Sequence, residues 1–174
     1  MTLQTRAPPN RLLTQYHWDE DELNQRRLEL LQSMKETQWH RNGVVAIDDT
    51  LLSKTGEEIP GAEKFWDHNS NSYLYGQSLV TSHYIDLDKD YPIDFRQYFK
   101  QGSLEAVKYG FRTKVDLALE LVDYCEALGI PVETYVFDAW FLCRKLTNHI
   151  ESYEKSWVGR LKVEPHRSTT RTKG

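Results

Sequence analysis

The chain has 174 residues, of which 39% are apolar, and this suits one globular domain with a continuous core. No stretch approaches the ~20 apolar residues of a membrane span, and the N-terminal residues lack the apolar core of a signal peptide. Both features argue against a membrane partner and favour a cytoplasmic location. Cys125 and Cys143 have no metal-binding or disulfide spacing, so we expect two reduced thiols.

Charge is distributed unevenly along the chain. The net charge of −4 argues against a general nucleic-acid binder, because phosphate binding depends on Lys and Arg. Residues 141–174, however, carry eight basic and three acidic side chains, a net charge of +5. This segment is either a solvated tail or an end of the protein that faces nucleic acid.

The first half of the chain predicts a helix and three strands. Residues 19–36 have acids in the first turn and apolar residues at helical spacing, which predicts an amphipathic helix. The apolar, mostly β-branched run that ends at Asp48 predicts a buried strand. Residues 51–71 are polar and contain glycines, so we expect a long loop, followed by strands over 72–88 and 91–99.

The second half predicts two helices and two more strands. Residues 112–128 place Val115, Ala118, Leu119, Val122 and Cys125 on one helical face. A strand over 132–137 ends at Asp138, and a helix over 139–150 leads to a strand over 155–162. We therefore divide the chain into an N-terminal helical segment (1–40), a core (41–163) and a disordered basic tail (164–174).

The order of the core elements is β-β-β-α-β-α-β, which is the order of the ribonuclease H-like fold. The predicted class is therefore α/β, with a mixed five-stranded sheet and an N-terminal helix. In that architecture the first and fourth strands are neighbours, so the carboxylates of Asp48 and Asp138 should meet. Two close carboxylates repel each other or recruit a cation, and Mg²⁺ prefers such oxygen ligands.

Other interpretations of these acids stay open. An acid after a strand is often only a loop or cap residue, and Asp49 is the fallback for Asp48. The stretch "AIDDTLL" also superposes on the D-x-D-x-T motif of haloacid-dehalogenase-like phosphatases, but Ala46 would then replace the nucleophilic aspartate. An alanine cannot form an aspartyl phosphate, which argues strongly against that class.

Four blocks, "VVAIDDTLLSKTG", "WDHNSNSYLYGQSLV", "YPIDFRQY" and "ETYVFDAWF", resemble DDE-type transposases of insertion sequences in the same order. The resemblance covers about residues 44–162. It implies a ribonuclease H-like core, transposon-end and target DNA as substrates, and Mg²⁺ or Mn²⁺ held by two Asp and one Glu. Asp48 matches the first acid and Asp138 the second.

The third acid is the departure from that pattern. In the family the glutamate lies on a later helix, and this sequence ends before such a helix; Glu164 does not fit the role. We therefore expect an incomplete, truncated core. The alternative is a non-catalytic remnant that binds DNA, or that pairs with a full-length transposase or in a homodimer, through its basic end. Lesser candidates for DNA contact are Lys54, Trp140, Arg160 and Lys162.

Overall fold

The computed structural model describes residues 19–56, 59–67 and 70–161. The chain forms two compact units, residues 1–38 and 39–174. The described part of the first unit contains α2 (Glu20–Ser33), which confirms the predicted helix. Asp19 caps it, because its Oδ1 accepts hydrogen bonds from the N–H groups of Asp21 and Glu22 at 3.1 and 3.0 Å.

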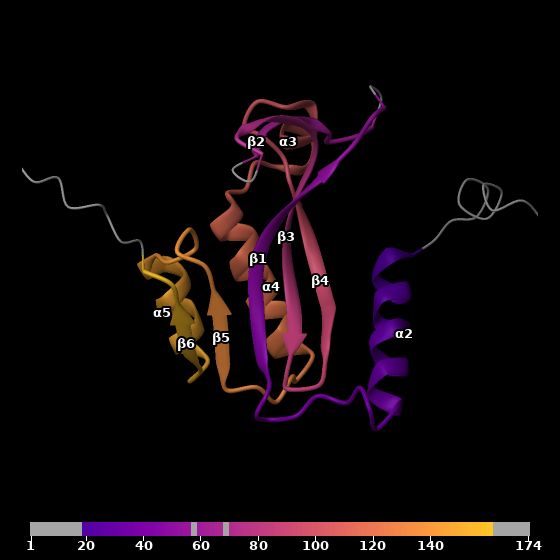
Figure 1. The fold of residues 1–174 in the computed structure, drawn as a ribbon, viewed down its shortest axis with the longest axis vertical. Coiled ribbons are helices and arrows are strands. Elements are labelled where there is room, and N and C mark those ends of the chain that lie inside the picture. The colour runs from indigo at the N-terminus through magenta and orange to yellow at the C-terminus, as the bar shows by residue number, and fades with distance from the viewer. Residues whose placement is uncertain (1–18, 57–58, 68–69, 162–174) are drawn as a thin grey trace, which may run out of the picture. The chain divides into compact units, whose positions relative to one another are not determined.

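The second unit is built on a mixed sheet, drawn in Figure 1. In the described residues it has six strands: β1 (Val44–Ser53), β2 (Glu63–Asp67), β3 (Ser72–Ile85), β4 (Asp90–Tyr98), β5 (Thr134–Phe137) and β6 (Ser156–Gly159). The order is β2-β3-β1-β5-β6, and β4 also pairs with β3. The first four strands are antiparallel, whereas β5 runs parallel to both β1 and β6. The predicted mixed α/β fold is confirmed, including the adjacency of the strand that carries Asp48 and the strand that leads to Asp138. The described sheet has six strands and not the five predicted, and β1 continues past Asp48 to Ser53.

Three details differ from the predictions. The expected loop over 51–71 contains the end of β1 and the whole of β2, whose alternate side chains are exposed and therefore look like loop residues in the sequence. A short helix, α3 (Leu104–Tyr109), was not predicted; Ser103 caps it. The helix expected over 139–150 is α5 (Arg144–Ser152), which begins later because the chain first makes a turn around the Asp138 carboxylate.

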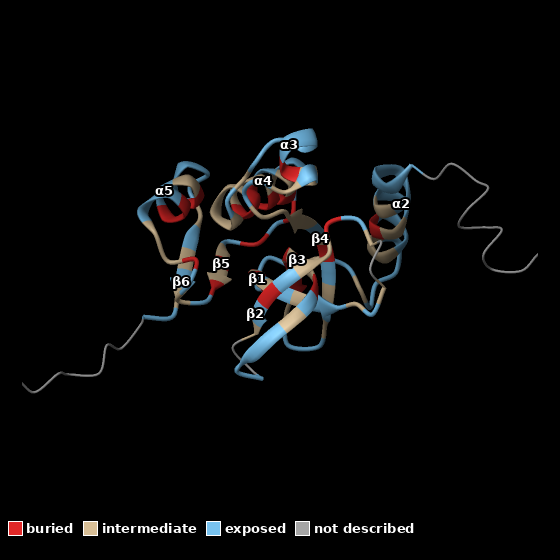
Figure 2. Ribbon diagram, turned by 90° about the horizontal axis from the view of Figure 1, so that it is seen from above, coloured by how far each residue is buried: buried red, intermediate tan, exposed pale blue. Residues whose placement is uncertain are grey.

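Two helices of the second unit, α4 and α5, cover one face of the sheet, as Figure 2 shows. A capping box between Thr113 and Asp116 starts α4 (Lys114–Ala127). This helix packs against β3 and β4 through buried residues: Leu117, Ala118, Leu121, Val122 and Cys125. On the sheet, Val45, Ile47, Tyr135 and Phe137 are buried. We call this the covered face and the opposite one the open face.

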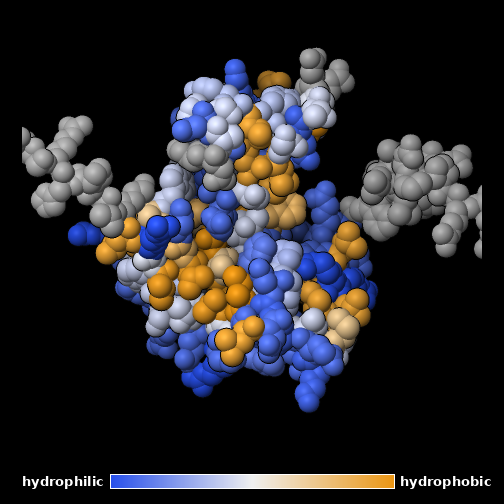
Figure 3. Space-filling model, viewed as in Figure 1, coloured by the Kyte–Doolittle hydropathy of each residue, from blue (hydrophilic) through white to orange (hydrophobic). Residues whose placement is uncertain are grey.

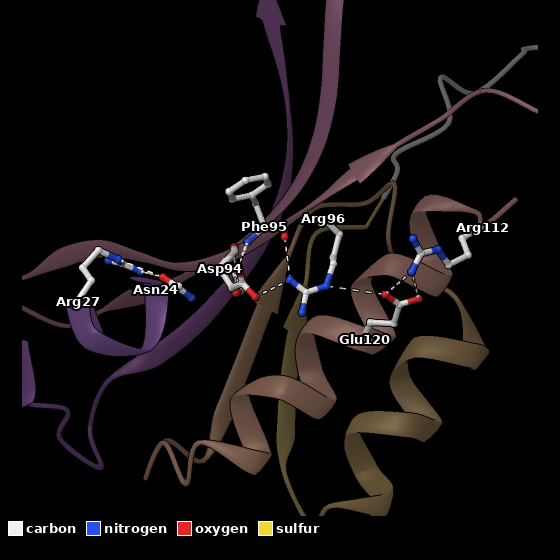
Figure 4. Close-up of polar contacts among 8 residues, drawn as sticks. Asn24, Arg27, Asp94, Phe95, Arg96, Arg112 and Glu120 are labelled. Carbon is white, nitrogen blue, oxygen red and sulfur yellow. Dashed lines mark hydrogen bonds and ion pairs between the residues drawn. The ribbon is translucent and has the colours of Figure 1, made fainter. Parts of the chain in front are cut away.

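An ion-pair network joins β4 to α4 (Figure 4). The Arg96 guanidinium pairs with Asp94 and donates to the Phe95 carbonyl oxygen at 2.8 Å. Its Nε lies 3.8 Å from Glu120 Oε2, and the same carboxylate accepts from Arg112 at 2.9 Å. These contacts fix the helix against the edge of the sheet.

Neither cysteine forms a disulfide, and burial raises the pKa of the Cys125 thiol to about 12. Among the described helices, none combines the length and the apolar character needed to cross a bilayer.

Candidate active site

The parallel pairing of β1 and β5 places two acidic residues side by side. Ala46 lies opposite Val136 and Ile47 opposite Phe137, and the next residue along each strand is Asp48 or Asp138. Both aspartates are exposed, and both follow the alternation of the open face. The structure therefore brings the two predicted residues side by side on the open face, Asp48 within β1 and Asp138 directly after β5.

Asp48 and Asp49 differ in the face that they occupy. Asp48 shares its face with the half-buried Val44 and Ala46, whereas Asp49 follows the buried Val45 and Ile47 on the covered face. The Asp49 carboxylate forms an ion pair with Lys114 at the start of α4. Asp49, the fallback ligand, thus already has a cationic partner on the opposite side of the sheet from Asp48.

The surroundings of Asp48 disfavour its negative charge. Partial burial is the largest cause that raises the pKa of Asp48 above its ordinary value of 3.8. The charges of Asp49 and Asp138 raise this pKa further, while the Asp49 N–H and the His83 ring act in the opposite direction. A bound cation would relieve the cost of this ionised carboxylate.

One oxygen of each carboxylate is held by the backbone. Asp48 Oδ1 accepts from the Asp49 N–H at 2.8 Å. Asp138 Oδ1 accepts from the N–H groups of Trp140 and Phe141 at 2.8 and 3.3 Å. Within the described part of the chain, no hydrogen bond or ion pair engages Oδ2 of either residue. The side chains are therefore oriented while each keeps one oxygen available for a ligand.

Two of the lesser candidates lie near this pair. Arg160 follows β6, and its N–H donates to the Phe137 carbonyl oxygen at 3.4 Å, which places its backbone beside Asp138. The Trp140 ring is 47% exposed, and its centroid lies 5.5 Å from Lys114 Nζ. Trp140 is thus a partner of the Lys114 ammonium, in addition to any contact with DNA.

The other two candidates do not join the pair. Lys54 lies just past the far end of β1, where its N–H donates to the Tyr75 carbonyl oxygen at 3.0 Å. Lys162 lies outside the described residues.

Sequence reasoning missed His83 and Lys114. His83 lies on β3 opposite Ala46, and its Nδ1 is 3.1 Å from Asp90 Oδ1. His83 is two residues after Thr81, which pairs with Asp48, so the two β3 side chains share a face. Once the register of β1 and β3 is known, this spacing places His83 on the same face as Asp48. No signal in the sequence links Lys114 to Asp49, because their contact depends on how the start of α4 packs against the sheet.

Residues 9–164 match a family model described as DDE superfamily endonuclease. The chain belongs to this family. The matched region includes Asp48 and Asp138 and the whole described sheet.

This chain is similar to a chain of the Mos1 transposase paired-end complex with left transposon end, with 15% sequence identity and a TM-score of 0.37. The match covers 93% of this chain and 46% of that chain, so this chain spans about half the length of the transposase chain. No curated protein matches this chain.

The oxygen donors of Asp48 and Asp138 suit part of a divalent-cation site. Mg²⁺ is commonly bound by one or two carboxylates together with water and substrate phosphates. Asp48 and Asp138 supply two such carboxylates, and the raised pKa of Asp48 marks a place where positive charge is favourable. In the described residues, no group of three or more His, Cys, Asp or Glu side chains is placed to hold a metal ion.

Proposed function

We propose that the chain is part of a transposase catalytic core that acts on transposon-end and target DNA, with Asp48 and Asp138 as ligands of Mg²⁺ or Mn²⁺. The family match supports an endonuclease that acts on DNA. The observation that supports the ligand assignment is the parallel register of β1 and β5, in which Asp48 and Asp138 follow the paired residues Ile47 and Phe137.

The chain's own residues perform two tasks in this proposal. The backbone donors at Asp49, Trp140 and Phe141 hold one oxygen of each carboxylate, so that the second oxygens can converge on a ligand. Arg160, beside Asp138, is placed to attract a DNA phosphate. A divalent cation held by Asp48 and Asp138 would supply Lewis-acid chemistry, because it would offset the charge that develops on a phosphodiester during cleavage and strand transfer.

The absence of a third ligand in the described residues favours a second candidate function. A protein that binds DNA, or that pairs with another transposase chain in a homodimer or with a full-length copy, needs no complete metal site. Its DNA binding would depend on cationic residues such as Arg160 and would not depend on the two aspartates. The cytoplasmic location expected from the sequence stays a prediction for either function.

The deciding experiment follows metal binding and DNA nicking by the same preparations. Mn²⁺ affinity is measured by electron paramagnetic resonance, and nicking of supercoiled plasmid is measured with Mg²⁺ or Mn²⁺. We expect wild type to bind Mn²⁺, and Asp48→Asn and Asp138→Asn each to lose this binding. In a version of the protein that also carries the third acid, each substitution should abolish nicking. The matched control is Asp88→Asn, because Asp88 is an exposed aspartate in the turn between β3 and β4.

DNA binding with neither nicking nor Mn²⁺ binding would support the non-catalytic function. Nicking at the wild-type rate by Asp138→Asn would show that the ligand assignment is wrong. Circular dichroism of each variant verifies that the fold is retained, because Asn keeps the side-chain volume of Asp.

A further inference from the structure

The hairpin of β2 and β3 has one face made of aromatic and basic side chains. The β2–β3 register pairs Trp66 with Tyr73 and Lys64 with Tyr75, so these four side chains share a face. Lys54 continues the β1–β3 register by one residue and lies opposite Tyr75. We call these five residues the aromatic face. In Figure 1 the hairpin lies at the opposite end of β3 from the β3–β4 turn.

The rings of the aromatic face are open to solvent. Trp66 is 44% exposed and Tyr73 is 63% exposed. Their centroids lie 5.1 Å apart in an edge-on arrangement, which leaves part of the flat ring surface uncovered. Lys64 Nζ lies 5.3 Å from the Tyr73 centroid. Large exposed rings are costly to keep in water, so a ligand with flat apolar groups is a fitting occupant.

The charge of this face is positive. The acids of β2, Glu63 and Asp67, alternate with Lys64 and Trp66 and therefore lie on the other face of the hairpin, with the buried Phe65. Among the described residues of β2 and of its partner segment in β3, the aromatic face has no carboxylate. Two lysines on either side of Tyr75 suit a ligand that carries negative charge beside its flat groups.

Unpaired nucleotides combine these two properties. Proteins hold single strands by stacking bases on aromatic side chains while cations follow the phosphates. A protein partner is usually matched by aliphatic as well as aromatic residues. Leu52, two residues before Lys54 on β1, is 40% exposed, whereas the more strongly exposed aliphatic residues, Leu87, Leu104 and Val107, lie outside this hairpin.

We propose that the aromatic face binds single-stranded nucleic acid. Unpaired bases stack on Trp66 and Tyr73, and Lys54 and Lys64 contact the phosphates. The proposal rests on the transposase function proposed above for the choice of DNA as the strand that is bound. Tyr75 lies six residues along β3 from Thr81, which faces Asp48, so the face is about 20 Å from the carboxylates.

The test uses the whole chain in EDTA, so that neither cleavage nor metal binding contributes. The probes are a fluorescein-labelled oligothymidine of about 20 nucleotides and a blunt duplex of equal length, both followed by fluorescence anisotropy. We expect Trp66→Ala and Tyr73→Ala each to weaken binding of the single strand about tenfold, with a smaller effect on the duplex. Trp66→Phe, which keeps a ring, should stay within about threefold of wild type.

Two further variants sharpen the result. Leu87→Ala removes a large side chain that is 95% exposed in the β3–β4 turn, and it should leave binding unchanged. Lys64→Gln should reduce the slope of log affinity against log salt by about 0.7, the value for one phosphate contact on a single strand.

Several outcomes would overturn the proposal. The first is that wild type does not bind the oligothymidine, and the second is that Trp66→Ala binds it with wild-type affinity. The third is that Trp66→Ala loses equal affinity for the single strand and the duplex. Conversion of a dimer to a monomer by Trp66→Ala, seen by sedimentation velocity with DNA affinity unchanged, would assign the face to protein contact instead. Because the assay contains EDTA, Asp48→Asn should bind the oligothymidine like wild type. Failure of nicking and failure of this proposal are therefore separate results.

Discussion

The carboxylates of Asp48 and Asp49 belong to consecutive residues but lie on opposite faces of the sheet, and only Asp49 forms an ion pair with Lys114. We expect Asp48→Asn to lower Mn²⁺ affinity at least tenfold with little change in stability. Asp49→Asn should leave Mn²⁺ affinity nearly unchanged. It should lower the free energy of unfolding by about 1–2 kcal/mol, because Lys114 is only 19% exposed and loses its carboxylate partner.

The control for this pair of variants is Lys114→Met. It should cost about as much stability as Asp49→Asn, and the double variant should cost less than the sum of the two, since both remove one interaction. Urea unfolding and manganese titration measure the two quantities. Loss of Mn²⁺ binding in Asp49→Asn, with binding retained in Asp48→Asn, would reverse the roles given to the two aspartates.

Metal affinity should depend on pH through Asp48. Burial and the neighbouring carboxylates raise its pKa in the folded protein, so a proton competes with the cation at a higher pH than for an ordinary aspartate. Mn²⁺ affinity should therefore fall as the pH is lowered from 7 towards 3.8, with a midpoint above 3.8. A flat profile over that range would contradict the involvement of Asp48.

The raised pKa of Asp48 also affects the stability of the metal-free protein. A folded pKa above the unfolded value means that ionisation of Asp48 destabilises the fold, and this penalty appears as the pH rises through the folded pKa. At pH 7, Asp48→Asn should therefore be as stable as wild type or slightly more stable in EDTA. Added Mn²⁺ should raise the stability of wild type and leave the variant unchanged.

The sequence was sufficient to predict the parallel neighbours β1 and β5, because an apolar run that ends in an acid occurs twice with a helix between. It was insufficient for β2, where every second side chain is exposed and no periodic apolar signal remains. The helical face of α4 was predicted only in part. Ala118, Val122 and Cys125 are buried as expected, but Leu117 and Leu121 are buried instead of Val115 and Leu119.

The reason lies in tertiary packing. Apolar residues occupy two adjacent stripes along α4, and the positions of β3 and β4 decide which residues of these stripes are buried. The candidate site shows the same limit. Asp48 and Asp138 could be found because each follows an apolar run in the sequence. The contact between Asp49 and Lys114 depends instead on how the start of α4 meets the sheet. Spacing along the chain does not report such a contact.

Asp116 should contribute to acid sensitivity. Its carboxylate accepts from Lys145 and from Thr113, and these contacts lower its pKa to about 2. A folded pKa below the unfolded value gives stability that is present above about pH 4 and is lost as the pH falls towards 2. Asp116→Asn keeps an acceptor oxygen for the cap but removes the charge, so it should cost about 1 kcal/mol at pH 7.

Urea unfolding at pH 7 and pH 3.5 measures this effect. The stability difference between wild type and Asp116→Asn should shrink at the lower pH, because part of the wild-type carboxylate is then protonated on unfolding. Lys145→Met should show the same trend with a smaller amplitude, as it removes only one of the partners. A difference that stays constant between the two pH values would mean that the charge of Asp116 does not stabilise the fold.

Gly76 is the point in β3 where β1 and β2 both pair, opposite Ser53 and Glu63. A Cβ at this position would lie 2.2 Å from the Leu52 carbonyl oxygen, which is backbone and cannot rotate away. Gly76→Ala should therefore force β1 and β3 apart and lower the free energy of unfolding by about 1–3 kcal/mol. Because Tyr75 and Lys54 pair next to this point, it should also weaken binding of the oligothymidine to the aromatic face.

Gly56→Ala is the matched control for this strand crossing. There the added Cβ meets only the flexible end of the Ile59 side chain, at 3.3 Å. Its stability should stay within about 0.5 kcal/mol of wild type, since an alanine also restricts the unfolded chain. Thermal and urea unfolding compare the two variants, and anisotropy with the oligothymidine compares their binding. Equal stability of Gly76→Ala and wild type would show that β1 and β3 can separate without cost at Leu52, and the register that holds Lys54 opposite Tyr75 would then be wrong.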